Sequence, residues 1–148
     1  MTTSEHRTTG SVCLARLNAA VIDPAEVEAA VSGPQHGAVV VFTGKVRDHD
    51  GGQSVSALEY SAHPEAERFL RRCCADAAAA TGLPVAALHR VGALAIGEIA
   101  IAVAVASPHR AEAFRACAEL VDRIKHEVPI WKRQHFADGV SEWVNACG

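Results

Sequence analysis

The stretch Ile99-Ala-Ile-Ala-Val-Ala-Val-Ala-Ser-Pro-His-Arg110 contains two structural signals in direct succession. Large β-branched residues alternate strictly with alanine from Ile99 to Ala106, which predicts a β-strand with one bulky face and one small face. We expect the small face to lie close against a helix. Ser107-Pro108 then begins a helix, because proline suits the first helical turn. The stretch therefore predicts a strand that is followed at once by a helix.

Two long helices are predicted. The helix that begins at Ser107-Pro108 is expected to continue to about Glu127 and to stop before Pro129. A second helix is predicted from Pro64 to about Thr81, and the Gly82 that follows is typical of a helix end. Phe114, Cys117, Ala118, Val121 and Ile124 are expected to form the apolar stripe of the first of these helices.

The remaining elements are shorter. Asp23-Pro24 begins a helix that ends near residue 33, with Glu26 in the position of a capping-box acid. Strands are predicted at residues 12–17, 38–47, 54–60 and 86–91, and short terminal elements at 130–136 and 141–144; residues 48–53 are expected to form a mobile hairpin loop. This order predicts an α+β fold with a mixed and partly antiparallel sheet. We expect a single domain over residues 11–148 and a solvated, disordered tail over residues 1–10.

The composition excludes several classes of protein. The chain has 148 residues, of which 49% are hydrophobic and 21% charged, so a mainly disordered chain is excluded. The net charge of -3 and the sequence pI near 6.2 argue against a nucleic-acid partner. The longest apolar stretch, residues 93–106, is too short to span a membrane, and the first ten residues lack a signal-peptide core. We therefore expect a cytoplasmic protein.

Neither the cysteines nor the histidines form a metal-binding pattern. The five cysteines have no CxxC spacing, and the eight histidines have no HxH or HExxH spacing, so no metal or other cofactor is expected. Cys73, Cys74 and Cys117 are predicted to be small buried hydrophobes. Trp131 is predicted to anchor the core.

Lysine is rare in this chain. Of the 14 basic residues only Lys45, Lys125 and Lys132 are lysines, and the others are arginines. Lysine can gain and lose a proton near neutral pH when its surroundings are tuned, which arginine cannot do. The three lysines are therefore candidates for proton chemistry, although their number alone is also compatible with chance.

Lys125 is the strongest of these candidates. It lies four residues after Val121 and seven after Ala118, so it projects from the predicted apolar stripe. One interpretation is that its ammonium extends to solvent at the helix end, where the helix dipole favours a cation. The other is that partial burial lowers its pKa and makes it a proton donor or acceptor.

Basic residues also gather in three other places. His109 and Arg110 stand in the first turn of the same helix, where a cationic pair and free backbone N–H groups favour an anion such as phosphate. Lys45 and Arg47 are two residues apart, so on a strand they face the same side and could hold one anion together. Lys132 and Arg133 follow closely after Lys125. The alternative for His109 and Arg110 is that both side chains turn away to nearby carbonyls or acids. The alternative for Lys45 and Arg47 is a solvated strand end.

Three of these segments together resemble one family. They are Phe42-Thr-Gly-Lys-Val-Arg47, then Ser107-Pro-His-Arg110, and then Lys125 with Val128-Pro-Ile-Trp-Lys132. They resemble the large, catalytic subunit of molybdopterin synthase, over about residues 37–144. The resemblance implies an α/β-hammerhead fold and a homodimer. It also implies a small ubiquitin-like sulfur carrier docked at each end, which makes a heterotetramer.

The resemblance further implies a reaction. The carrier's C-terminal Gly-Gly thiocarboxylate would enter the catalytic pocket, and two sulfurs would be transferred to cyclic pyranopterin monophosphate. The product is the dithiolene of molybdopterin, so the implied activity is that of a sulfurtransferase in molybdenum cofactor biosynthesis. The alternative is a non-catalytic module that uses the same basic groups to bind anions or to dock the carrier.

Site residues follow from the resemblance position by position. Lys125 matches the essential catalytic lysine and Lys132 the second active-site lysine. The substrate-binding positions are matched by Lys45, Val46, Arg47, His109, Arg110, Arg133 and Gln134. Gln134 stands where many relatives carry an acid, and residues 60–64 depart from the commoner Glu-His-Tyr pattern.

The length of the helix places one condition on this site. Arg110 and Lys125 are fifteen residues apart, so their backbones are separated by about 22 Å at the helical rise of 1.5 Å per residue. One small pterin does not readily touch both residues within one protomer. We therefore predict that each pocket combines Lys125 and Lys132 of one subunit with His109 and Arg110 of the other.

Overall fold

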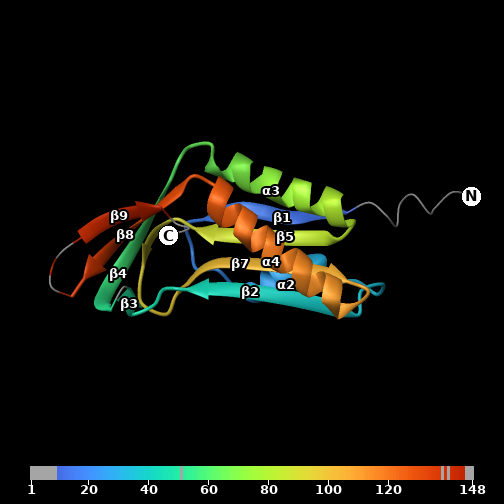
Figure 1. The fold of residues 1–148 in the computed structure, drawn as a ribbon, viewed down its shortest axis with the longest axis horizontal. Helices are drawn as coiled ribbons and strands as arrows, with labels where there is room; N and C mark the ends of the chain where they lie inside the picture. The colour runs from blue at the N-terminus through green and yellow to red at the C-terminus, as the bar shows by residue number, and fades with distance from the viewer. Residues whose placement is uncertain (1–9, 51, 138, 140, 146–148) are drawn as a thin grey trace, which may run out of the picture.

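Two β-sheets form the frame of the molecule (Figure 1). The computed structural model describes residues 10–50, 52–137, 139 and 141–145. The first sheet has the order β1 (Ser11–Asn18), β5 (Pro84–Arg90), β7 (Ile99–Ser107), β2 (Ala38–Lys45). The second runs β3 (His49–Asp50), β4 (Gln53–Ala62), β8 (Ile130–Phe136), β9 (Ser141–Asn145), and β6 (Gly92–Leu94) also pairs with β4. The second sheet lies at one end of the first, as the expected hammerhead-like arrangement requires.

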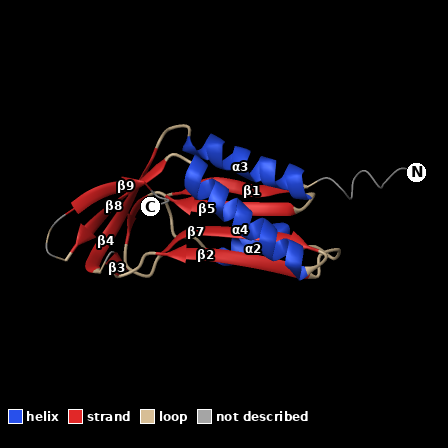
Figure 2. Cartoon of the chain, in the orientation of Figure 1, coloured by secondary structure: helices blue, strands red, loops and turns tan. Residues whose placement is uncertain are grey.

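Three helices cover the two faces of the first sheet (Figure 2). α3 (Ala66–Thr81) and α4 (Arg110–Glu127) pack on one face, and α2 (Pro24–Val31) packs on the other. The alternation in β7 explains this arrangement. Ile101, Val103 and Val105 enter the core beneath α3 and α4. The alanines between them share a second core with Val27 and Val31 of α2, so the small face does lie against a helix.

The pairing pattern confirms the predicted α+β class. β1 pairs with β5 in parallel, whereas β5 and β2 both run antiparallel to β7. The ends of β2 and β5 therefore meet the beginning of β7 at one edge of the sheet. This edge faces the second sheet (Figure 1).

Several boundaries differ from the sequence predictions. α4 begins at Arg110 with His109 as its N-cap, so Ser107-Pro108 precedes the helix and does not open it. Residues 49–50 form the short strand β3 of a hairpin that the sequence predicted as a loop, and β6 was not predicted. Asp23 caps α2 by accepting from the Ala25 N–H, but the Glu26 carboxylate pairs with Arg16 at 2.9 Å in place of the expected capping-box bond.

Three residues lie in environments other than those predicted from the sequence: two predicted core residues are exposed, and one predicted tail residue is closely packed. Phe114 is 61% exposed, because the buried face of α4 is formed by Ala113, Ala116, Cys117, Leu120, Val121 and Ile124. Trp131 is 41% exposed and does not anchor the core. Gly10 was assigned to the tail, but it packs so closely on α3 that an added Cβ would lie 2.0 Å from the Ala78 carbonyl oxygen. The rest of the predicted tail, residues 1–9, lies outside the described residues.

Candidate active site

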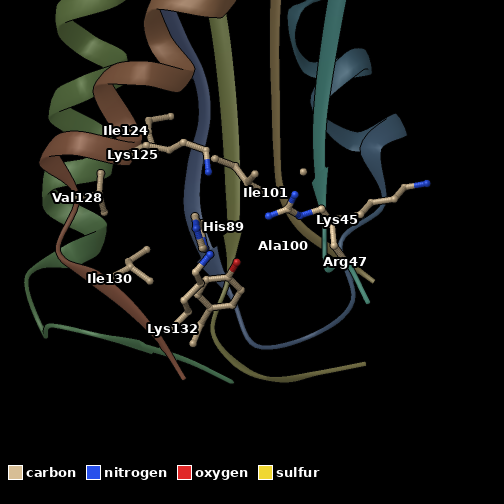
Figure 3. Close-up of a pocket in the computed structure, with 12 residues that line it drawn as sticks. Lys45, Arg47, His89, Ala100, Ile101, Ile124, Lys125, Val128, Ile130 and Lys132 are labelled. Carbon is tan, nitrogen blue, oxygen red and sulfur yellow. The ribbon is translucent and has the colours of Figure 1, made fainter. Parts of the chain in front are cut away.

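A pocket of about 270 Å³ lies where the two sheets and the end of α4 meet. Its walls come from the ends of β2 and β5, the beginning of β7, the strands β4 and β8, and the last turn of α4. The residues that line it are Gly44, Lys45, Arg47, Tyr60, His89, Ala100, Ile101, Ile124, Lys125, Val128, Ile130 and Lys132. Residues from six elements therefore meet at this pocket, and Figure 3 shows their side chains around it.

The pocket is rich in positive charge. Lys125 is half-buried in the last turn of α4, and Lys132 is half-buried on β8, directly opposite Tyr60 of β4. In Figure 3 the ammonium groups of these two lysines and the guanidinium of Arg47 point toward the centre of the pocket. These groups have no acidic residue among the pocket's described lining, so the site is suited to an anion.

Lys45 and Arg47 diverge in this structure. Both are exposed and both border the pocket, as the alternation predicted. However, Figure 3 shows the Lys45 ammonium directed away from the pocket centre and the Arg47 guanidinium directed into it. Arg47 also lies 3.6 Å from the carboxylate of Asp50. Only Arg47 is thus oriented to contact a ligand without a change of rotamer.

Val46, between these two cations, is fixed by the turn before β7. Its side chain is buried, its N–H donates to the Glu98 carbonyl at 3.0 Å, and its carbonyl accepts from the Gly97 N–H at 2.9 Å. The same turn is held by Arg90, whose guanidinium donates to the Glu98 carboxylate at 3.1 Å. Val46 can therefore position Lys45 and Arg47, but its own backbone groups are already engaged.

The three predicted residues of β8 lie on different faces. Lys132 and Gln134 share one face, and Gln134 is buried at 3% exposure, with its side-chain oxygen unpaired. Arg133 lies on the opposite face, across from Glu59. Neither Arg133 nor Gln134 borders the pocket, although Gln134 is on the pocket-facing side of the strand.

His109 and Arg110 lie at the other end of α4. They border a separate surface hollow with Gly37, Ala38, Pro108 and Ala111. The helix places them about 22 Å from Lys125 along its axis. Within one protomer, His109 and Arg110 at the N-terminal end of α4 are therefore remote from the pocket at the C-terminal end of that helix.

Sequence reasoning missed His89 and Tyr60 as pocket residues. His89 ends the apolar strand β5 and is 6% exposed, and burial together with the nearby Lys125 charge lowers its pKa to about 4. Tyr60 contacts its ring edge-on, with 5.0 Å between ring centroids, and burial raises the pKa of the Tyr60 hydroxyl. The available signal was a polar His-Arg pair at the end of an otherwise apolar strand.

The described residues form no metal site and no membrane-spanning helix. They contain no cluster of three or more His, Cys, Asp or Glu side chains arranged to hold a metal. None of the helices in the described ranges has the length and apolar character needed to cross a bilayer. Cys73, Cys74 and Cys117 are buried free thiols, as predicted, and burial raises the pKa of each.

Comparison with known proteins shows one family that the chain matches and several proteins to which it is similar. Residues 17–127 match the family described as MoaE protein. The chain is 46% identical over 123 residues to molybdopterin synthase catalytic subunit 1 of Mycobacterium tuberculosis, covering 80% of this chain and 82% of that protein. It is 42% identical to the molybdopterin synthase catalytic subunit of a Nostoc species, covering 81% and 74%. The solved structure of molybdopterin synthase from Staphylococcus aureus is similar with a TM-score of 0.82 and 37% identity, covering 88% and 96%.

Proposed function

The chain belongs to the MoaE protein family, and from this premise we propose that it is the catalytic subunit of a molybdopterin synthase. Its substrate would be cyclic pyranopterin monophosphate, and its activity the transfer of two sulfurs that form the dithiolene of molybdopterin. The protein is then a sulfurtransferase of molybdenum cofactor biosynthesis. We place this reaction in the cytoplasm.

The observation that carries the proposal is the convergence of Arg47, Lys125 and Lys132 on one pocket. Both reactants are anions, because the pterin carries a phosphate and the carrier brings a thiocarboxylate. Charge-assisted hydrogen bonds from ammonium and guanidinium groups suit both anions. Positive charge in a partly desolvated pocket also stabilises negative charge that develops on sulfur and oxygen during transfer.

We propose that the sulfur donor is a small ubiquitin-like carrier subunit that ends in a Gly-Gly thiocarboxylate. Each transfer would move the thiocarboxylate sulfur to the pterin, so two carriers are consumed for each product. A flexible Gly-Gly end can enter a narrow pocket because it has no side chains beyond its backbone. One carrier at each end of a homodimer gives the heterotetramer.

Within the pocket we assign two roles. Lys125 is the proton donor or acceptor while sulfur replaces oxygen on the pterin. Lys132 supplies charge and orients the pterin. Lys45, Val46, Arg47, His109, Arg110, Arg133 and Gln134 are proposed as substrate-binding positions, with Val46 acting through the placement of its neighbours.

The pocket is small for the substrate when one protomer stands alone. Ligand sites commonly measure roughly 300–1,000 Å³, and this pocket measures about 270 Å³. We therefore propose that a second protomer completes it with His109 and Arg110 of the partner subunit. The phosphate would bind to this cationic helix start, whereas the pterin ring would lie near Lys125 and Lys132.

An exposed apolar stripe of α4 supports such a dimer. Phe114 and Ala118 are exposed, and they border a groove with Val40, Val41 and Phe42 of the edge strand β2. Ala118 lies midway between Arg110 and Lys125, and Phe114 lies one helical turn before it. If two copies of α4 pack antiparallel about a two-fold axis at this midpoint, the Arg110 of each copy approaches the Lys125 of the other. Burial of Phe114 would stabilise the pair.

The direct test uses the protein with a thiocarboxylated carrier and the cyclic pterin. We expect the dithiolene product to be detected by its mass, together with carrier that has lost its sulfur. The alternative function, a non-catalytic anion-binding or docking module, predicts carrier binding without product. Absence of product with a carrier that is demonstrably bound and thiocarboxylated would overturn the proposed activity.

A further inference from the structure

His89 is a buried polar side chain inside the pocket for which no role has been assigned above. Its ring is held by two contacts. Nδ1 lies 2.8 Å from the Arg90 carbonyl oxygen, and the ring meets Tyr60 edge-on at an interplanar angle of 87°. Because the ring is also 6% exposed, its orientation is fixed more firmly than that of the flexible lysines around it.

The Arg90 contact determines which ring nitrogen holds the proton. A carbonyl oxygen only accepts hydrogen bonds, so Nδ1 must be the donor. In the neutral imidazole Nε2 then carries an unshared electron pair and acts as an acceptor. Burial and the positive charge of Lys125 disfavour a second proton and lower the pKa of His89 to about 4. At neutral pH Nε2 is therefore an uncharged acceptor.

The neighbours of this acceptor are almost all donors. Lys45, Arg47, Lys125 and Lys132 line the same pocket and can only donate hydrogen bonds, whereas Tyr60 can donate or accept. Figure 3 shows the His89 ring between the ammonium groups of Lys125 and Lys132. Among the described lining side chains, the His89 imidazole thus supplies the one nitrogen acceptor.

We propose that His89 is a positioning residue for Lys125: the two side chains share the pocket without a hydrogen bond in this structure, and a rotation of the lysine lets its ammonium donate to Nε2 and holds it in the pocket. The inference rests on the proposed function, since it assigns Lys125 the proton-transfer role. The physical reason for this role is repulsion between the positive charge of Lys125 and the neighbouring positive charges of the pocket. Without an acceptor, a half-buried lysine beside Lys132 and Arg47 would turn toward solvent, where its charge is hydrated.

Two substitutions separate the two ring nitrogens. In His89→Asn the side-chain amide takes the place of Nδ1 and can still donate to Arg90, but no acceptor remains at the position of Nε2. In His89→Gln the amide oxygen takes the place of Nε2 and restores that acceptor. Both variants remove the aromatic ring. His89→Gln also gives up the donor to the Arg90 carbonyl, so any activity that it recovers over His89→Asn comes from the acceptor.

Both variants are assayed with thiocarboxylated carrier and cyclic pterin beside the unsubstituted protein. We expect His89→Asn to lower kcat by about 10- to 100-fold with a KM within about twofold, and His89→Gln to recover most of the loss. Equal kcat in His89→Asn and the unsubstituted protein would overturn the inference, as would equal losses in both variants. If the unsubstituted protein itself makes no product, the proposed function fails instead.

A second measurement does not depend on turnover, and its first part needs no variant. Long-range proton–nitrogen NMR of the unsubstituted protein reports which imidazole nitrogen is protonated. We expect the His89 proton on Nδ1 at neutral pH and a perturbed Nε2 signal when Lys125→Ala removes the donor. A proton on Nε2, or an Nε2 signal that is unchanged by Lys125→Ala, would contradict the assigned hydrogen bond.

Discussion

The Arg90 guanidinium donates to the Glu98 carboxylate at 3.1 Å and thereby ties the end of β5 to the turn that precedes β7. Arg90 is almost fully buried, with 7% of its side chain exposed. Glu98 also accepts from the Ala95 N–H at 2.8 Å, and these two donors hold the pKa of its carboxyl below the usual range. The backbone of the same turn forms hydrogen bonds with Val46. The Arg90–Glu98 ion pair therefore stabilises the chain next to Arg47.

Removal of this carboxylate should destabilise the protein. Glu98→Ala leaves the buried Arg90 cation without its anionic partner, which is a costly arrangement. We expect a clearly lower urea midpoint for Glu98→Ala and a smaller decrease for Glu98→Gln, which retains one of the two oxygen acceptors. Equilibrium unfolding followed by circular dichroism measures both. Equal midpoints for Glu98→Ala and the unsubstituted protein would show that the pair contributes nothing.

Lys125 and Arg110 should complement each other between subunits. Lys125→Ala removes the proposed proton-transfer group and Arg110→Ala the proposed phosphate contact, so we expect each homodimer to be inactive. In a mixed dimer of the two variants, one of the two shared pockets has both residues intact. Such dimers, co-expressed with different affinity tags and purified over both, should regain about half of the normal activity.

Two outcomes would contradict this arrangement. Activity of the Lys125→Ala homodimer would refute the role of the amine, provided that its circular dichroism spectrum is unchanged. Mixed dimers as inactive as the parent variants would show that each pocket takes both residues from one subunit. The mixed dimer of Lys125→Ala with the unsubstituted chain serves as a control, because it retains one complete pocket under either arrangement.

Phe114 should be required for dimerisation. It is 61% exposed in the single chain and lies about one helical turn from the middle of the proposed α4–α4 contact. Phe114→Asp places two like charges near the two-fold axis, and we expect the protein to become monomeric in light scattering after size-exclusion chromatography. Val21→Asp is a matched control, because Val21 is 72% exposed and lies outside that contact. A Phe114→Asp protein that stays dimeric at micromolar concentration would place the interface elsewhere.

The sequence predicted the frame of the fold more accurately than the details of its surfaces. Alternation in residues 99–106 identified β7 and correctly placed its alanine face against a helix. The period of α4 did not distinguish its core face from a neighbouring apolar stripe. Phe114 and Ala118 therefore entered the predicted core stripe, although the structure leaves both exposed. A helix that packs on its own sheet and on another protomer has two apolar stripes, and a single sequence does not tell them apart.

The candidate site was predicted only where local spacing sufficed. Lys125 was expected to leave the apolar stripe of its helix, and the structure places it at the pocket edge with Lys132. His89 and Tyr60 were missed because they reach the pocket through pairing between distant strands, which depends on register and not on local pattern. Trp131 was misplaced for a different reason: strand alternation in β8 turns it to the face opposite to the buried Ile130.

His89 should also produce a measurable pH dependence of stability. Its pKa is about 4 in the folded protein, compared with 6.5 for an unperturbed histidine. Above pH 6.5 His89 is neutral in the folded and the unfolded states, so it does not change the free energy of unfolding with pH. Between pH 6.5 and 4 the unfolded chain binds a proton that the folded protein does not, so the free energy of unfolding falls with decreasing pH. Integrated over this window, the loss from His89 is about 3 kcal/mol.

Comparison of His89→Asn with the unsubstituted protein isolates the contribution of His89 to the pH dependence of stability, because the two proteins share all other titrating groups. We expect the stability difference between the two proteins to shrink by about 3 kcal/mol as the pH falls from 6.5 to 4, because only the unsubstituted protein loses the His89 contribution. Urea unfolding at half-unit steps of pH measures it. A difference that stays constant across this window would mean that His89 titrates normally in the folded state. The neutral acceptor required to position Lys125 would then be largely protonated below pH 6.5.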